Sequence, residues 1–97
     1  NSGRDGSIPG FSMKSLTHRT FDKDHKKLTP KIKEQFKVRR NVFLVEPFHP
    51  ILNNHELHGK YSGCRSINIS GNYRAIYFMN KDVAIFIRIG THPELYS

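Results

Sequence analysis

The chain has 97 residues, 36% of them hydrophobic, and its 16 Lys and Arg against 8 Asp and Glu give a formal net charge of +8. This length favours one domain, and the single cysteine, Cys64, rules out an internal disulfide and hence a secreted disulfide scaffold. No apolar run approaches the roughly 18 residues that a membrane span needs. The composition therefore indicates a small, basic, cytoplasmic protein whose partner is anionic: nucleic acid, an acidic protein or an acidic membrane surface.

Residues 1–12 differ from the rest of the chain. They are rich in Gly and Ser, show no apolar period and precede Met13. We interpret them as an expression-vector remnant, which leaves residues 13–97 as a single domain.

The first elements expected are a short strand over residues 14–19 and two helices. Thr20, with acids in the turn after it, has the pattern of a helix cap. Thr29 followed by Pro30 repeats the signal and predicts a second helix that runs to about Val45.

The second half of the chain changes to a period of two. Residues 65–69, 73–79 and 83–89 predict three antiparallel strands, with Val83, Ile85, Ile87 and Ile89 on one face of the last. The fold class is therefore α+β: a short N-terminal strand and a helical hairpin packed on one face of a C-terminal antiparallel sheet. We expect the other face to stay open, with a groove lined by Arg65, Arg74, Arg88 and residues 90–92.

Positive charge concentrates in the helical half. Residues 13–48 hold ten basic and four acidic residues, a balance of +6. One interpretation is a phosphate-binding layer, and the other is an ordinary solvated helix face. The lysines expected to bind phosphate are Lys26, Lys27, Lys31, Lys33 and Lys37.

Histidines lie in predicted loops, among them His55, His58 and His92. Cleavage of RNA through its own 2′-hydroxyl needs a base for the 2′ proton, cations for the phosphate oxygens and an acid for the leaving 5′ oxygen. Imidazoles, guanidiniums and a tyrosine can fill these roles without metal. The alternative is a three-histidine zinc site, which the net charge of +8 disfavours. We therefore expect no metal and no cofactor.

Three ordered motifs resemble one toxin family. LNNHELHGKYSGCRS over residues 52–66 and GNYRAIY over residues 71–77 resemble the loop and strand signatures of the RelE superfamily. IGTHPELY over residues 89–96 is similar to the C-terminus of the YafQ branch. The resemblance covers about residues 21–96.

This resemblance implies a bacterial type II toxin that cuts mRNA in the ribosomal A site without metal, as a ribosome-dependent endoribonuclease. It implies an antitoxin partner, usually acidic, and contact with DNA only through the toxin–antitoxin complex. The lysines of the helical layer would then hold ribosomal RNA. Two alternatives stay open: a toxin of the same fold that inhibits a protein such as DNA gyrase, as the ParE branch does, and a catalytically weak RNA-binding toxin.

The resemblance also assigns roles by position. His92 matches the family's terminal acid–base histidine and is the expected general acid. His55 matches another active-site histidine, expected to act as the base or to position phosphate. Arg74 matches an arginine that stabilises transition-state charge, and Tyr96 matches a terminal aromatic that stacks on or orients the substrate. Arg65 matches a strand arginine near the groove.

Two positions depart from the family pattern. Asn68 stands where a histidine is usual and Asn72 where an acid is usual. Asparagine can hydrogen-bond substrate but cannot carry protons, so we expect both to bind substrate, together with Lys60. His58, three residues from His55, is a candidate to compensate for the missing acid–base groups.

Overall fold

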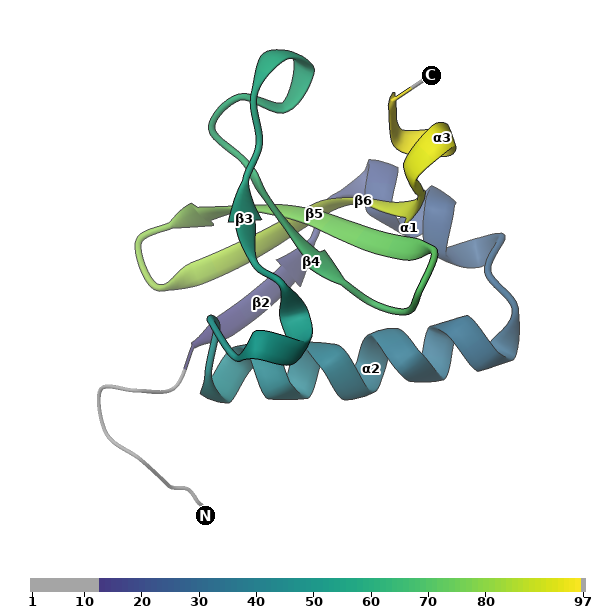
Figure 1. Cartoon of the computed structure of the whole chain (residues 1–97), viewed down its shortest axis with the longest axis horizontal. Helices are drawn as coiled ribbons and strands as arrows, with labels where there is room; N and C mark the ends of the chain where they lie inside the picture. The colour runs from purple at the N-terminus through teal and green to yellow at the C-terminus, as the bar shows by residue number, and fades with distance from the viewer. Residues whose placement is uncertain (1–12, 97) are drawn as a thin grey trace.

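The computed structural model describes residues 13–96, so the segment interpreted as a vector remnant lies outside the described part. Three α-helices and five strands follow one another with two short 3₁₀ turns (Figure 1). In chain order they are β2 (Lys14–Thr17), α1 (Arg19–Lys26), α2 (Pro30–Val45), η1 (Pro50–Leu52), β3 (His55–Glu56), η2 (Gly59–Tyr61), β4 (Arg65–Asn68), β5 (Tyr73–Asn80), β6 (Val83–Thr91) and α3 (His92–Tyr96).

The two helix starts differ in how well local sequence predicts them. Thr29 caps α2 as expected, with its hydroxyl accepting from the Ile32 amide at 3.4 Å and with Pro30 in the first turn. The start predicted for α1 is wrong, because His18 is the cap and the helix begins at Arg19. The Thr20 hydroxyl instead donates to the Ile87 carbonyl at 2.6 Å, so a tertiary contact replaces the expected cap.

The strands form one sheet in the order β2-β6-β5-β4-β3. All neighbours are antiparallel except β2, which runs parallel to β6 and pairs with residues 83–86. Beyond β2, side chains of α1 cover the exposed edge of β6: Thr20 bonds the Ile87 carbonyl, and Asp24 accepts from the Ile89 amide at 3.2 Å. These bonds satisfy backbone groups that a bare edge strand would leave unpaired.

The main core lies between the sheet and the helices. Phe86 of β6 has no exposed surface and is surrounded by aromatic rings, with centroids 5.4 Å away at Phe36, 5.7 Å at Phe43 and 5.6 Å at Tyr77. Burying an aromatic side chain of this size contributes about 1.5–3 kcal/mol. In Figure 1, α2 runs along this face of the sheet, below it in the view.

The prediction that Val83, Ile85, Ile87 and Ile89 share one face of β6 is wrong. The register passes from Tyr77↔Phe86 to Ile76↔Arg88, so Ile87 is an extra residue at a β-bulge. The bulge changes the phase of the alternation. Ala84, Phe86 and Ile89 therefore enter the main core, whereas Ile87 packs on the other side of the sheet.

The opposite face is more covered than expected. A second buried cluster lies there, formed by Leu57, Tyr61, Ile76 and Leu95. It joins α3 to the segment 57–64, which stands above the sheet in Figure 1. We call this the far face of the sheet, because it lies opposite α2. No helix within residues 13–96 is long and apolar enough to cross a membrane.

Candidate active site

Arg74 and Asn68 lie side by side on the far face. Tyr73, Ala75 and Tyr77 of β5 pack with the main core, so the alternate residues Arg74 and Ile76 point away from it. Asn68 is paired with Arg74 across the β4–β5 ladder and shares its face. The Oδ1 atom of Asn68 is buried and has no hydrogen-bond partner within the described residues. The far face therefore holds a free acceptor beside a cation.

His92 and Tyr96 come together on α3. They are four residues apart on one helix face, and their ring centroids are 4.6 Å apart. Tyr96 also makes an edge contact with Tyr61 at 5.4 Å. The Tyr61 hydroxyl donates to the Leu95 carbonyl at 2.8 Å, and Leu95 is only 1% exposed. Because a helix of five residues is unstable alone, these contacts fix the positions of both rings.

A cavity of about 380 Å³ brings three of the predicted residues together. Arg74, His92 and Asn72 line it with Gly71, Thr91 and Pro93. Tyr96 belongs to the same neighbourhood: burial, and then Tyr61, raise the pKa of its hydroxyl, whereas the charge of Arg74 lowers it. The sequence motifs at residues 71–77 and 89–96 therefore meet at one cavity.

His55 lies apart from this cavity. It is on β3, paired with Ser66 of β4. Three strand spacings, about 14 Å in total, separate β3 from β6. The Nδ1 atom of His55 donates to the Asn53 carbonyl at 2.8 Å, because a carbonyl oxygen can only accept.

The predicted residues His58 and Lys60 lie at the start of η2 and within it. His58 is exposed at the start of η2, makes no cap hydrogen bond and does not line the cavity. Lys60 lies over the ring of Tyr61, with its ammonium 5.5 Å from the centroid. Lys60 is thus connected through Tyr61 to Tyr96.

The expectation that Arg65 lines the groove is wrong. Arg65 shares its face of β4 with Ile67, which is in the main core, so it lies on the side opposite Arg74. Its Nε donates to the Asn54 Oδ1 at 2.7 Å, and its guanidinium lies 5.3 Å from the centroid of Phe48. Strand alternation from Ile67 would have predicted this.

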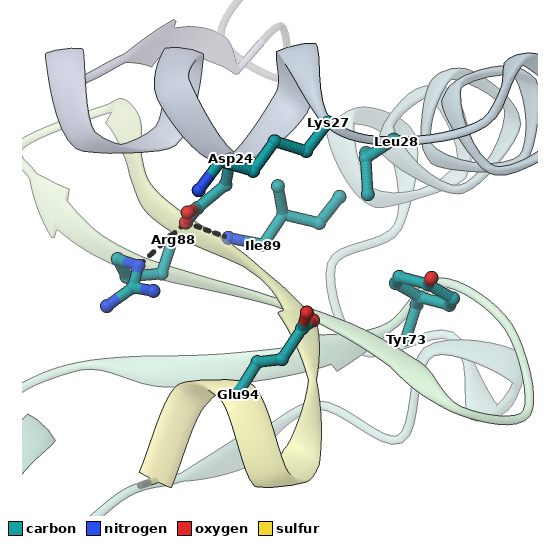
Figure 2. Close-up of a pocket in the computed structure, with 7 residues that line it drawn as sticks. All are labelled: Asp24, Lys27, Leu28, Tyr73, Arg88, Ile89 and Glu94. Atoms are coloured by element: carbon teal, nitrogen blue, oxygen red, sulfur yellow. Dashed lines mark hydrogen bonds and ion pairs between the residues drawn. The ribbon is translucent and has the colours of Figure 1, made fainter.

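Arg88 lies on the far face, opposite Ile76 in the ladder, and at the edge of β6 it lines a cavity of about 290 Å³ beside α1 (Figure 2). Its Nε donates to Asp24 at 2.7 Å, and this contact is the first cause that raises the pKa of Arg88. Glu94 accepts from the Thr91 amide at 2.9 Å. A Cβ atom at Gly90 would lie 3.0 Å from the Glu94 carboxylate, so glycine there allows α3 to fold back closely.

The predicted phosphate-binding lysines lie in the helical layer and at the edge of the sheet beside it, where Lys27 lines the same cavity as Arg88 and Glu94 (Figure 2). Lys26 ends α1, Lys27 follows it, and Lys31, Lys33 and Lys37 lie along α2. Figure 1 places α2 and α3 on opposite sides of the sheet. The sequence-based list missed Tyr61, whose only signal was an aromatic residue between two loop glycines. It also missed Thr91 and Pro93, which stand in the same motif as His92.

Metal ligands do not gather in this structure. Within residues 13–96, no three side chains of His, Cys, Asp or Glu lie close enough together to hold a metal ion. Cys64 is half-buried, and burial raises the pKa of its thiol, which disfavours the reactive thiolate.

Comparison with known proteins decides the family. The model of the YafQ family, described as bacterial toxins of type II toxin–antitoxin systems, matches residues 13–97. The chain belongs to the YafQ toxin family. This membership makes it a type II toxin of the RelE superfamily, and the arrangement of helices and sheet agrees with the fold of solved YafQ structures.

Solved structures of YafQ toxins share the fold. The Escherichia coli DinJ–YafQ toxin–antitoxin complex matches 89% of this chain and 99% of its own, with 21% identity and a TM-score of 0.73. YafQ from E. coli BL21(DE3) matches 88% and 99%, with 21% identity and a TM-score of 0.71. A copper-bound variant of a Helicobacter pylori toxin matches 87% and 99%, with 25% identity and a TM-score of 0.66. No curated protein sequence matches the chain.

Proposed function

We propose that this YafQ-family toxin is an endoribonuclease that cleaves mRNA on the ribosome, through the 2′-hydroxyl and without a metal ion. One observation carries the proposal: Arg74 and His92 line the same cavity, and the Tyr96 ring lies 4.6 Å from that of His92. A cation, an imidazole and an aromatic hydroxyl are the groups that this chemistry needs.

The reaction divides into two proton movements around one displacement. A base removes the 2′-hydroxyl proton, and the 2′ oxygen attacks phosphorus. The bond from phosphorus to the 5′ oxygen breaks, and an acid protonates that oxygen, leaving a 2′,3′-cyclic phosphate and a 5′-hydroxyl. His92 acts as the acid in this scheme. Arg74 stabilises the charge that grows on the phosphate oxygens, an effect of about 10²–10³ in rate for comparable donors.

The surrounding polar groups position the substrate. The raised pKa of Tyr96 keeps its hydroxyl protonated, so it orients the nucleotide as a neutral ring and a donor. Asn72 on the cavity wall and Asn68, which pairs with Arg74 on the far face, bind substrate groups. Lys60 adds a cation beside Tyr61. His55 positions phosphate at a neighbouring nucleotide, because three strand spacings, about 14 Å, separate β3 from β6 and put its ring out of reach of the 2′ proton of the bond that His92 protonates. Compensation by His58 stays a prediction.

Anchoring on the ribosome is the role of the helical layer. Lys26, Lys27, Lys31, Lys33 and Lys37 hold the phosphates of ribosomal RNA, which fixes the toxin without reading sequence. Affinity for ribosomes should therefore fall steeply as the salt concentration rises. In a plot of log affinity against log salt concentration, each phosphate neutralised should steepen the fall by about 0.7–0.9. An affinity that does not change with salt would contradict this part.

The partner that controls the toxin is an antitoxin. The E. coli relative is solved as a DinJ–YafQ toxin–antitoxin complex. With a net charge of +8, this toxin should pair with an acidic antitoxin and meet DNA only through that complex. The pair acts in the cytoplasm, where translating ribosomes are.

The test is cleavage of an mRNA on programmed ribosomes in the presence of EDTA. We compare the natural chain with His92→Gln and, as a control, with Met79→Leu, an exposed residue at the other end of β5. Cleavage in the A site should fall about 10²–10⁴-fold in His92→Gln and stay unchanged in Met79→Leu. No cleavage by any of them would reject the proposal, and inhibition of gyrase supercoiling would then be measured.

A further inference from the structure

A cavity in the helical layer is distinct from the one at His92. It has a volume of about 440 Å³ and lies where α1 and α2 meet. Its lining residues are His25, Pro30, Lys33, Glu34, Phe36, Lys37 and Arg40. Lys33, Lys37 and Arg40 are four and three residues apart along α2, so they share one helix face. Three cations therefore surround one concave site.

The three cations of this cavity, Lys33, Lys37 and Arg40, make no ion pair within the described residues, although the carboxylate of Glu34 also lines the cavity. The Nε of Arg40 is buried and has no acceptor, and the single hydrogen bond of its guanidinium goes to Asn41 at 3.3 Å. A buried donor without an acceptor costs free energy, so Arg40 has an unsatisfied hydrogen-bond donor in a residue that lines the cavity.

His25 adds a titratable group to the wall. Its ring packs against Phe21 at 5.8 Å and Phe36 at 6.2 Å. Burial lowers its pKa, the charge of Lys33 lowers it further, and Asp22 opposes both. Glu34, Lys37 and Arg40 are the other charged groups of the wall. The shift due to Lys33 shows that the positive field of the cavity reaches the imidazole.

We propose that this cavity is a phosphate-binding site, and that in the bound toxin it holds a backbone phosphate of ribosomal RNA; the RNA assignment rests on the proposed function. Two ammonium groups and a guanidinium suit the several oxygens of one phosphate. The cavity lies in the helical layer, whereas Arg74 and His92 line the far face, so the anchored strand differs from the cleaved strand.

Phosphate binding should take up a proton. An anion beside His25 favours the imidazolium, which opposes the effects of burial and of Lys33. The pKa of His25 should therefore rise when the site is filled. The charged ring would then donate to the phosphate as a further partner.

The first experiment uses inorganic pyrophosphate and NMR of the histidine rings in the purified toxin. We compare Lys33→Gln/Lys37→Gln with Lys14→Gln/Lys23→Gln, which removes the same charge from exposed sites on β2 and α1, outside the cavity and outside the five lysines assigned to ribosomal RNA. Affinity should fall about tenfold or more in the cavity variant and about twofold in the control. The His25 resonances of the natural chain should move on binding. Equal losses in the two variants, or His25 resonances that do not move, would overturn the site.

The second experiment identifies the source of the phosphate. Ribosome affinity is measured against salt for the same two variants, and each lost phosphate contact should lower the log–log slope by about 1. The slope should fall in Lys33→Gln/Lys37→Gln and change less in the control. If pyrophosphate binds at the cavity but the ribosome slope is the same in both variants, the site serves free phosphate compounds and the RNA assignment is wrong.

The two proposals fail separately. Pyrophosphate binding needs no cleavage. If the toxin binds pyrophosphate at His25 but never cuts mRNA, only the proposed function is rejected. Conversely, if His92-dependent cleavage is normal at saturating toxin but pyrophosphate does not bind, only the phosphate-binding site at the cavity is rejected. All these substitutions are at exposed or half-exposed lysines, so unfolding free energies should stay within about 0.5 kcal/mol of the natural chain.

Discussion

The two faces of the sheet are covered in different ways. Within the described residues, twelve buried side chains form the core on the helix side, whereas four form the cluster on the far face. The rest of the far face carries polar groups, among them Arg74, His92 and the unpartnered Asn68. A polar group left unsatisfied costs stability, and such groups gather at functional sites. The difference indicates that one face supplies most of the folding free energy and the other is kept for binding and chemistry.

The largest effect on the helix side should come from Phe86→Ala. Phe86 is fully buried among Phe36, Phe43 and Tyr77, and truncating a buried phenylalanine costs about 3–5 kcal/mol. Urea unfolding monitored by circular dichroism measures the loss. Met79→Leu serves as the control and should change the free energy of unfolding by less than about 0.5 kcal/mol. A loss below 1 kcal/mol for Phe86→Ala would mean that stability is not concentrated on this face.

On the far face, Arg74→Gln should mainly affect catalysis. Removing one group that stabilises transition-state charge lowers the rate by about 10²–10³, while the free energy of unfolding should change little because Arg74 is half-buried and lines an open cavity. Single-turnover cleavage on ribosomes and urea unfolding measure the two quantities. Arg74→Lys should recover part of the rate because it keeps the charge. If the free energy of unfolding falls by as much as the activation free energy of cleavage rises, the division between the faces is wrong.

Local sequence signals predicted the helix side well. Thr29 and Pro30 fixed the start of α2, and the apolar residues Phe36 and Phe43 proved to be buried on it. Two of the three motifs, those at residues 71–77 and 89–96, meet at one cavity, because short antiparallel connections bring the starts of β5 and α3 together. These features depend on residues close together in the chain.

The errors arise where distant segments decide the structure. No residue pattern in the sequence predicts the bulge at Ile87. The bulge reverses the alternation of β6, so that Ile89 rather than Arg88 lies in the core. The start of α1 moved because the Thr20 hydroxyl bonds Ile87, 67 positions away. The five-residue α3 exists through Leu95 and Tyr61, not through its own helix propensity.

Tyr61→Phe sharpens the comparison with a smaller effect. It removes the hydroxyl that donates to the Leu95 carbonyl at 2.8 Å and leaves the ring in place. The free energy of unfolding should fall by about 0.5–1.5 kcal/mol. Cleavage should fall severalfold, since α3 holds His92 and Tyr96 less firmly. Urea unfolding and ribosome cleavage test both, and a variant with normal cleavage would show that this bond does not position α3.

The smallest effect concerns pH and His25. Burial, and then Lys33, lower the pKa of His25 in the folded chain, so the unfolded state binds more protons between the folded and unfolded pKa values. The stability due to the neutral ring is therefore full above the unfolded pKa of about 6.5 and is lost as pH falls through the folded value. His25→Gln should show a shallower fall in unfolding free energy between pH 7 and pH 5. Identical slopes would contradict the assignment.

The division between the two faces is tested most directly by one pair of measurements on His92→Gln: cleavage of mRNA on programmed ribosomes with EDTA, and the free energy of unfolding. Our account predicts that cleavage in the A site falls by about 10²–10⁴ while the free energy of unfolding changes by less than about 0.5 kcal/mol. Full cleavage by this variant, or a loss of cleavage matched by a loss of stability, would contradict it.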